Sequence, residues 1–125
     1  MTASAYQDIL DVAVRILLFE DQSITIVFTP GEGSIRLPTT RRLAEYLGIP
    51  HYYVLPRFAA MERDGLIRRV ERVGISTTPA GTKAIVSLLE ERYPGVADAL
   101  LPEGVFSALK RLAGTNGSND RIPRE

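Results

Sequence analysis

The chain has 125 residues, of which 45% are hydrophobic, and this suits one domain with its own core. It contains no cysteine, which excludes disulfides, thiolate chemistry and cysteine-type zinc sites. Because it has no long apolar run and no secretory-signal pattern at the N-terminus, we expect a cytoplasmic protein that does not span a membrane.

The charged residues are unevenly distributed, although the formal net charge is zero. Residues 1–35 carry a net charge of −4, residues 36–72 carry +4 and residues 73–125 carry zero. Most of the basic residues are arginine, which binds phosphate and guanine through two parallel hydrogen bonds. The middle third therefore has the charge of a nucleic-acid-binding surface, and a merely solvated surface is the alternative.

The first half of the chain shows helical and strand-like periodicity in turn. Apolar residues at helical spacing predict helices, and short apolar-polar alternations predict strands. The predicted elements are a helix at about 4–20, a strand at 24–28, an extended segment at 35–37, a helix that opens at 38–40 and ends at Gly48, and a helix at about 51–64. The core residues predicted for the last two helices are Leu43, Ala44, Leu47, Val54, Phe58 and Met61.

The second half begins with a predicted hairpin, in which residues 66–72 and 75–77 are the strands. Thr78 has the position of a helix cap and Pro79 that of a first helical residue, so a helix is predicted at 79–92. Two short helices at about 96–101 and 103–113 follow, and the polar segment 114–125 is predicted to be a disordered tail. We expect one domain at 1–113, mainly α with a small β-hairpin wing, in the element order of a winged helix-turn-helix with extra terminal helices.

Three segments, at 40–50, 61–69 and 78–81, resemble the DNA-binding half of MarR-like and related winged-helix transcription regulators. The resemblance implies a DNA-binding core at about 36–92. It places helix 51–64 in the major groove of DNA and the wing 68–76 on the DNA backbone or minor groove. Pro56 departs from the pattern, because a proline inside the recognition helix is expected to kink or split it. The wing is also short, and Thr77 stands where the related proteins usually have leucine.

Candidate DNA contacts gather on the helix pair and on the wing. Arginines and hydroxyls there are suited to phosphate oxygens, and an arginine in the recognition helix is also suited to a guanine edge. For Tyr52 and Tyr53, packing into the core is an equal alternative, and His51 has no second histidine with which to hold a metal. The candidate contacts are Thr39, Thr40, Arg41, Arg42, His51, Tyr52, Tyr53, Arg57, Arg69 and Arg72.

The terminal helices carry many apolar residues that a winged-helix core of about sixty residues would leave uncovered. They are Tyr6, Leu10, Val14 and Leu17 in the first helix, and Val96, Leu100, Leu101, Val105, Phe106, Leu109 and Leu112 in the last two. We therefore expect these helices to form a homodimer, which would match palindromic half-sites in DNA. The alternative is that they complete the core of the monomer.

The sequence offers no glycine-rich phosphate loop, no cluster of metal ligands and no catalytic pair, so we expect neither an enzyme nor a cofactor. The predicted function is that of a dimeric transcription regulator that binds double-stranded DNA and associates with the nucleoid. A DNA-binding adaptor of a chromosome or plasmid partition system is one alternative, and a winged-helix protein-interaction module is the other.

Overall fold

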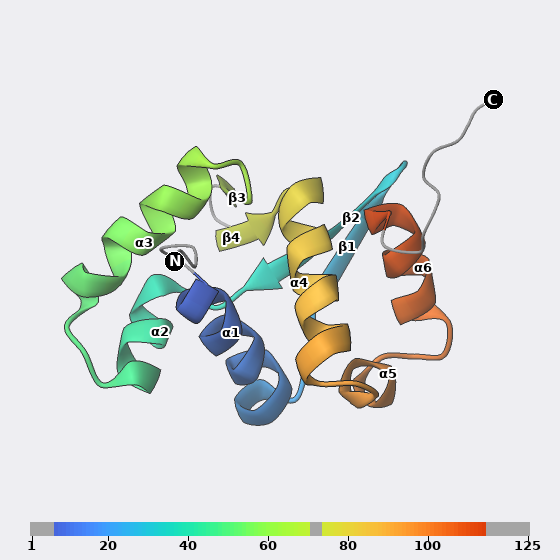
Figure 1. The fold of residues 1–125 in the computed structure, drawn as a ribbon, viewed down its shortest axis with the longest axis horizontal. Helices are drawn as coiled ribbons and strands as arrows, with labels where there is room; N and C mark the ends of the chain where they lie inside the picture. Colours follow the sequence, from blue (N-terminus) through green and yellow to red (C-terminus); the bar gives the residue numbers. More distant parts are fainter. Residues whose placement is uncertain (1–6, 71–73, 115–125) are drawn as a thin grey trace.

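In a computed structural model of the protein, residues 7–70 and 74–114 are described. The fold is α+β, mostly helical with one small antiparallel sheet (Figure 1). The elements are α1 (Gln7–Arg15), η1 (Ile16–Asp21), β1 (Ile26–Thr29), β2 (Glu32–Leu37), α2 (Thr40–Leu47), α3 (His51–Arg63), β3 (Ile67–Val70), β4 (Gly74–Thr77), α4 (Pro79–Arg92), α5 (Val96–Leu100) and α6 (Val105–Ala113). The helices α2 and α3 lie at one end of the molecule and α5 and α6 at the other (Figure 1).

The sheet is larger than the predicted wing hairpin, because β1 and β2 form a hairpin of their own. Its strand order is β1-β2-β4-β3, and every neighbouring pair is antiparallel. β2 joins the two hairpins through the pairs Arg36–Ser76 and Leu37–Ile75. The segment that leads into the helix pair is therefore held by the same sheet as the strands β3 and β4.

A chain of hydroxyl groups ties this sheet to α4. The Ile35 amide donates to Thr77 Oγ1 at 2.8 Å, and Thr77 Oγ1 lies 2.6 Å from Thr82 Oγ1. Thr82 Oγ1 donates to the Gly33 carbonyl at 2.8 Å, so the proton between the two hydroxyls comes from Thr77. Both threonines are buried. Leucine at position 77 would break this chain, which gives a physical reason for the threonine there.

The helix pair α2–α3 is held by the residues that the sequence predicts. Leu43, Val54, Phe58 and Met61 are fully buried, and Ala44 is nearly so. The expectation that Pro56 splits the recognition helix is wrong, because α3 is one helix from His51 to Arg63. Proline removes one backbone hydrogen bond. The ring of Pro56 is exposed, while buried side chains on both sides of it fasten the two halves of α3 to the same core.

The first helix ends in a wide turn. In η1 the hydrogen bonds follow the π pattern, and three consecutive residues, Ile16, Leu17 and Leu18, are all buried. The predicted start of this helix at residue 4 and the predicted tail from residue 115 onward lie outside the described residues.

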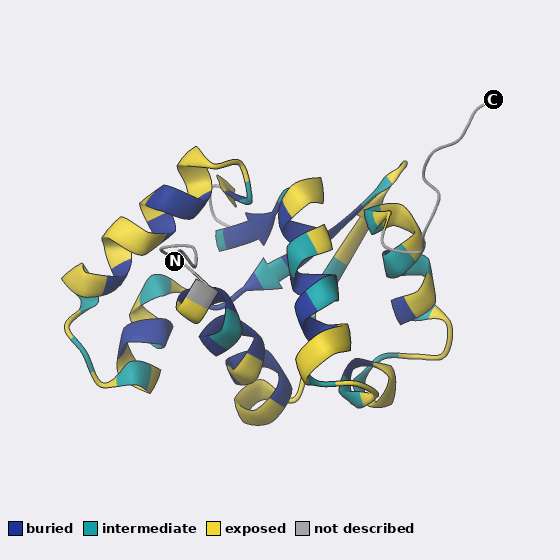
Figure 2. Ribbon diagram, in the orientation of Figure 1, coloured by how far each residue is buried: buried dark blue, intermediate teal, exposed yellow. Residues whose placement is uncertain are grey.

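The argument that the terminal helices are left uncovered is wrong. Within the single chain Leu10, Val14, Leu17, Phe106 and Leu109 are buried, and Val96, Leu100 and Leu101 pack partly buried against the same core. Figure 2 shows buried residues on α1 and α4 in the middle of the molecule and on α6. Leu112 remains 41% exposed, and Tyr6 lies outside the described residues. These helices complete the core of the monomer, which is the alternative that the sequence left open.

Candidate nucleic-acid interface

The N-terminal half of α3 presents an aromatic surface. Tyr52 is 65% exposed and Tyr53 is 56% exposed, so neither packs into the core. Their ring centroids lie 4.7 Å apart with the ring planes tilted by 40°. Val54 and Phe58, which are buried, fix the opposite side of the helix and thereby turn the tyrosines outward. The core alternative for the two tyrosines is therefore excluded.

His51 and Thr40 bind each other. His51 Nε2 lies 2.6 Å from Thr40 Oγ1, and the contact joins the first residue of α3 to the first residue of α2. Which atom donates depends on the histidine tautomer. The sequence predicts both residues as separate DNA contacts, whereas the geometry gives them a shared role in setting the angle between the two helices.

The start of α2 is held in two ways. The Thr39 hydroxyl accepts a hydrogen bond from the Arg42 amide at 3.1 Å and so caps the helix. The guanidinium of Arg42 donates to both carboxylate oxygens of Asp21, at 2.7 and 3.1 Å. The hydrogen bond to Asp21 raises the pKa of Arg42 above its ordinary value. Thr39 and Arg42 therefore have structural partners inside the protein.

The strand β3 is tied to two other elements. Arg69 Nε lies 3.3 Å from Glu62 Oε1 of α3, and Arg68 Nη2 lies 2.7 Å from Glu32 Oε2 of β2. Arg68 and Arg69 are successive residues of one strand, so their side chains point to opposite faces of the sheet, and each meets an acid on its own face. Arg72, the predicted contact at the wing tip, lies outside the described residues.

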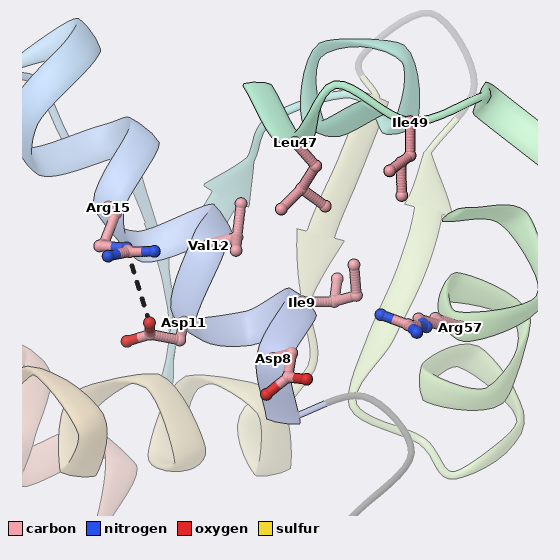
Figure 3. A pocket seen from close by; sticks show the side chains of 8 residues that line it. All are labelled: Asp8, Ile9, Asp11, Val12, Arg15, Leu47, Ile49 and Arg57. Carbon is pink, nitrogen blue, oxygen red and sulfur yellow. Dashed lines mark ion pairs between the residues drawn. The ribbon is translucent and has the colours of Figure 1, made fainter. Parts of the chain in front are cut away.

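Arg41 and Arg57 are exposed, and neither has an ion-pair or hydrogen-bond partner within residues 7–70 and 74–114. Arg57 extends from α3 toward α1, into an open groove of about 420 Å³ (Figure 3). Asp8 and Ile9 of α1 line the other side of the groove, and Leu47 lines its end. Arg57 lies about one helical turn after buried Val54, on the side of α3. Its side chain therefore points in a different direction from that of Tyr52.

The sequence does not identify the acids that bind Arg42, Arg68 and Arg69, of which Arg42 and Arg69 are predicted contacts. Asp21 and Glu32 lie 21 and 36 residues from their partners, and Glu62 and Arg69 belong to different elements, so no regular spacing within one helix or strand marks the pairs. A grouping of three or more histidine, aspartate or glutamate side chains suited to a metal ion does not occur among the described residues. Nor does the described part of the chain contain a helix long and apolar enough to cross a membrane.

Comparison of the chain with protein-family models, with curated proteins and with solved structures finds no match. The geometry of this surface is therefore what indicates a function.

Proposed function

We propose that the protein is a winged-helix protein that binds double-stranded DNA and regulates transcription as a homodimer. The order of α1, β2, α2, α3 and the β3–β4 hairpin is the order of a winged helix-turn-helix, with β1 as an additional edge strand. In this arrangement α3 would enter the major groove and the β3–β4 loop would reach the adjacent backbone or minor groove.

The observation that carries the proposal is the outward face of α3. Tyr52 and Tyr53 lie exposed at its N-terminal end, and Arg57 on its flank has no partner among the described residues. Tyrosine hydroxyls and a free guanidinium are suited to phosphate oxygens and to guanine. Arg41, at the exposed start of α2, adds a second uncompensated charge next to the same helix pair.

A dimer needs a surface other than the buried sides of the terminal helices. Outside the α2–α3 pair and the β3–β4 hairpin, the large apolar residues exposed in the described part of the chain are Phe19, Val27, Phe28 and Leu112. Two copies related by a two-fold axis would double the phosphate contacts and match a palindromic site. The partition-adaptor alternative would use the same DNA surface, and it differs in covering many adjacent sites. Footprint length on DNA separates the two, and both place the protein at the nucleoid.

The test is a fluorescence-anisotropy titration of a labelled mixed-sequence duplex at a series of salt concentrations. Wild type is compared with Tyr52→Ala and Arg57→Ala, and the matched control is Arg111→Ala, on exposed α6 at the other end of the molecule (Figure 1). Removal of one phosphate contact is expected to lower the salt slope by about 1. The control is expected to bind like wild type. Absence of duplex binding at low salt by the folded wild type would overturn the proposal.

A second candidate is a protein-interaction module. Its support is the composition of α3, which contains no asparagine or glutamine and exposes Pro56 and Ala59 beside Tyr52. Its other arginine, Arg63, pairs with Asp64 at 3.6 Å. Aromatic residues such as Tyr52 are enriched where proteins meet proteins. If Tyr52→Ala changes the oligomeric state while duplex binding is absent, this candidate replaces the first.

A further inference from the structure

Arg36 of β2 has a buried donor without an acceptor. Its Nε atom is buried and has no hydrogen-bond partner within the described residues. Buried polar atoms are nearly always hydrogen-bonded, because burial removes the water that would otherwise bind them. The side chain is therefore folded into a position where the protein itself supplies no acceptor.

Two acids in the neighbourhood of Arg36 are already bound to other arginines. Arg36 lines two separate hollows, and Asp21 lines the first of them, but both carboxylate oxygens of Asp21 bind Arg42. Glu32, on the same strand as Arg36, binds Arg68 at 2.7 Å. Arg36 forms no ion pair with any residue in the described ranges, so its charge is uncompensated there.

The register of the sheet builds a site around this side chain. Arg36 is paired with Ser76 and Ser76 with Arg68, so the three side chains share one face across three strands. It is the face away from α4, since the alternate residue Thr77 binds Thr82 of that helix. Here a hollow of about 250 Å³ is lined by Arg36, Arg68, Ser34 and Ser76, with Val27 and Val70.

We propose that this hollow binds a small oxyanion, a phosphate or carboxylate group, with Arg36 as its main ligand. The two Nη groups of Arg36, which are not among its buried atoms, can donate to two oxygens at once, in a bidentate geometry that arginine forms with such anions. Arg68 makes both of its hydrogen bonds, to Glu32 and Ser34, from Nη2 and keeps its other N–H groups for the anion. The hollow is smaller than the roughly 300–1,000 Å³ of sites for drug-sized molecules, which suits a small anion.

The test is an NMR titration with inorganic phosphate and, separately, with succinate, each compared with sodium chloride at equal ionic strength. The amide signals of Ser34, Arg36 and Ser76 are expected to shift and saturate with one or both oxyanions and not with chloride. Arg36→Gln is expected to weaken binding about tenfold or more, because it removes charge-assisted hydrogen bonds. Arg111→Gln, an exposed arginine of α6 outside the sheet and outside the proposed DNA surface, is the matched control and is expected to bind like wild type.

Shifts that follow ionic strength without saturating, or equal losses in Arg36→Gln and Arg111→Gln, would overturn the proposal. If Arg36→Gln does not fold by circular dichroism, Arg36→Lys serves instead, since it keeps the charge and loses the two-oxygen geometry. The proposal is independent of DNA binding, which a parallel duplex titration checks. If Arg36→Gln weakens duplex binding as much as phosphate binding, the anion is a DNA phosphate and the small-ligand site is refuted.

Discussion

Replacing Thr77 by valine tests the hydroxyl chain that joins the sheet to α4. Valine has nearly the same shape as threonine, so packing is kept while the hydroxyl is lost. The Ile35 amide, which donates to that hydroxyl at 2.8 Å, then has no acceptor in a fully buried position. The Thr82 hydroxyl loses its donor and keeps only its bond to the Gly33 carbonyl.

The expected cost follows from these two losses. A buried donor without a partner costs about 1–3 kcal/mol and one further hydrogen bond contributes about 1 kcal/mol, so Thr77→Val should lower the free energy of unfolding by about 2–4 kcal/mol. Thr77→Ser keeps the chain and loses one methyl group, which should cost only about 1 kcal/mol. Thr77→Ser should therefore be more stable than Thr77→Val, which is the opposite of what hydrophobic burial alone would give.

Urea unfolding followed by circular dichroism gives both free energies, with equal slopes showing that the same surface is exposed. The double variant Thr77→Val/Thr82→Val should cost less than the two single changes together, because the residues share one chain. If Thr77→Val is as stable as Thr77→Ser or more so, the chain of hydroxyl groups contributes nothing to the free energy of unfolding and the reasoning is refuted.

Three further predictions concern separate parts of the molecule. Gly81→Ala should lower the free energy of unfolding measured in urea, although alanine favours helices, because a Cβ there would lie 1.8 Å from the Leu66 carbonyl oxygen; an unchanged or higher value would contradict this. Burial and the hydrogen bond to Asp11 raise the pKa of Tyr93 above the ordinary 10.0. The contribution of Tyr93 to stability should therefore be complete below about pH 10 and be lost as the pH rises through the folded-state pKa. In urea titrations at several pH values, Tyr93→Phe should not show this loss. Arg36→Met should leave the melting temperature in buffer without oxyanions unchanged or raised, because it removes a buried donor without an acceptor; a clear fall would show that Arg36 stabilises the fold by itself.

Local signals in the sequence predicted the helices well. Thr78 caps α4 by accepting from the Gly81 amide, and Gly48 ends α2 in the left-handed conformation, as residues of those types do at such positions. The spacing of Val54, Phe58 and Met61 identified the buried side of α3. Each of these signals depends on neighbours within a few turns, so the chain itself contains the necessary information. Pro56 shows the limit of such local signals, because packing against the rest of the protein keeps α3 continuous through the proline.

The candidate site was predicted less completely, because its partners come from distant parts of the chain. Asp21 and Glu32 belong to the acidic first segment, and only the folded sheet and helices bring them to Arg42 and Arg68. A count of charges per segment treated those arginines as available, whereas the fold neutralises them. The same limit applies to the terminal helices, because the sequence alone does not show how far the core of the monomer extends over their apolar residues.

The wide turn η1 at the end of the first helix has a consequence for how this chain tolerates changes in length. A π turn closes one residue more than an α turn, and it is this surplus that puts Ile16, Leu17 and Leu18 on the core side together. Phe19, in the same turn, is 52% exposed. Deletion of that one residue would convert the turn to ordinary α-helix, and one of the three buried side chains would then turn away from the core. The end of the first helix is therefore a place where packing fixes the length of the chain, so that length variation is expected in the loops.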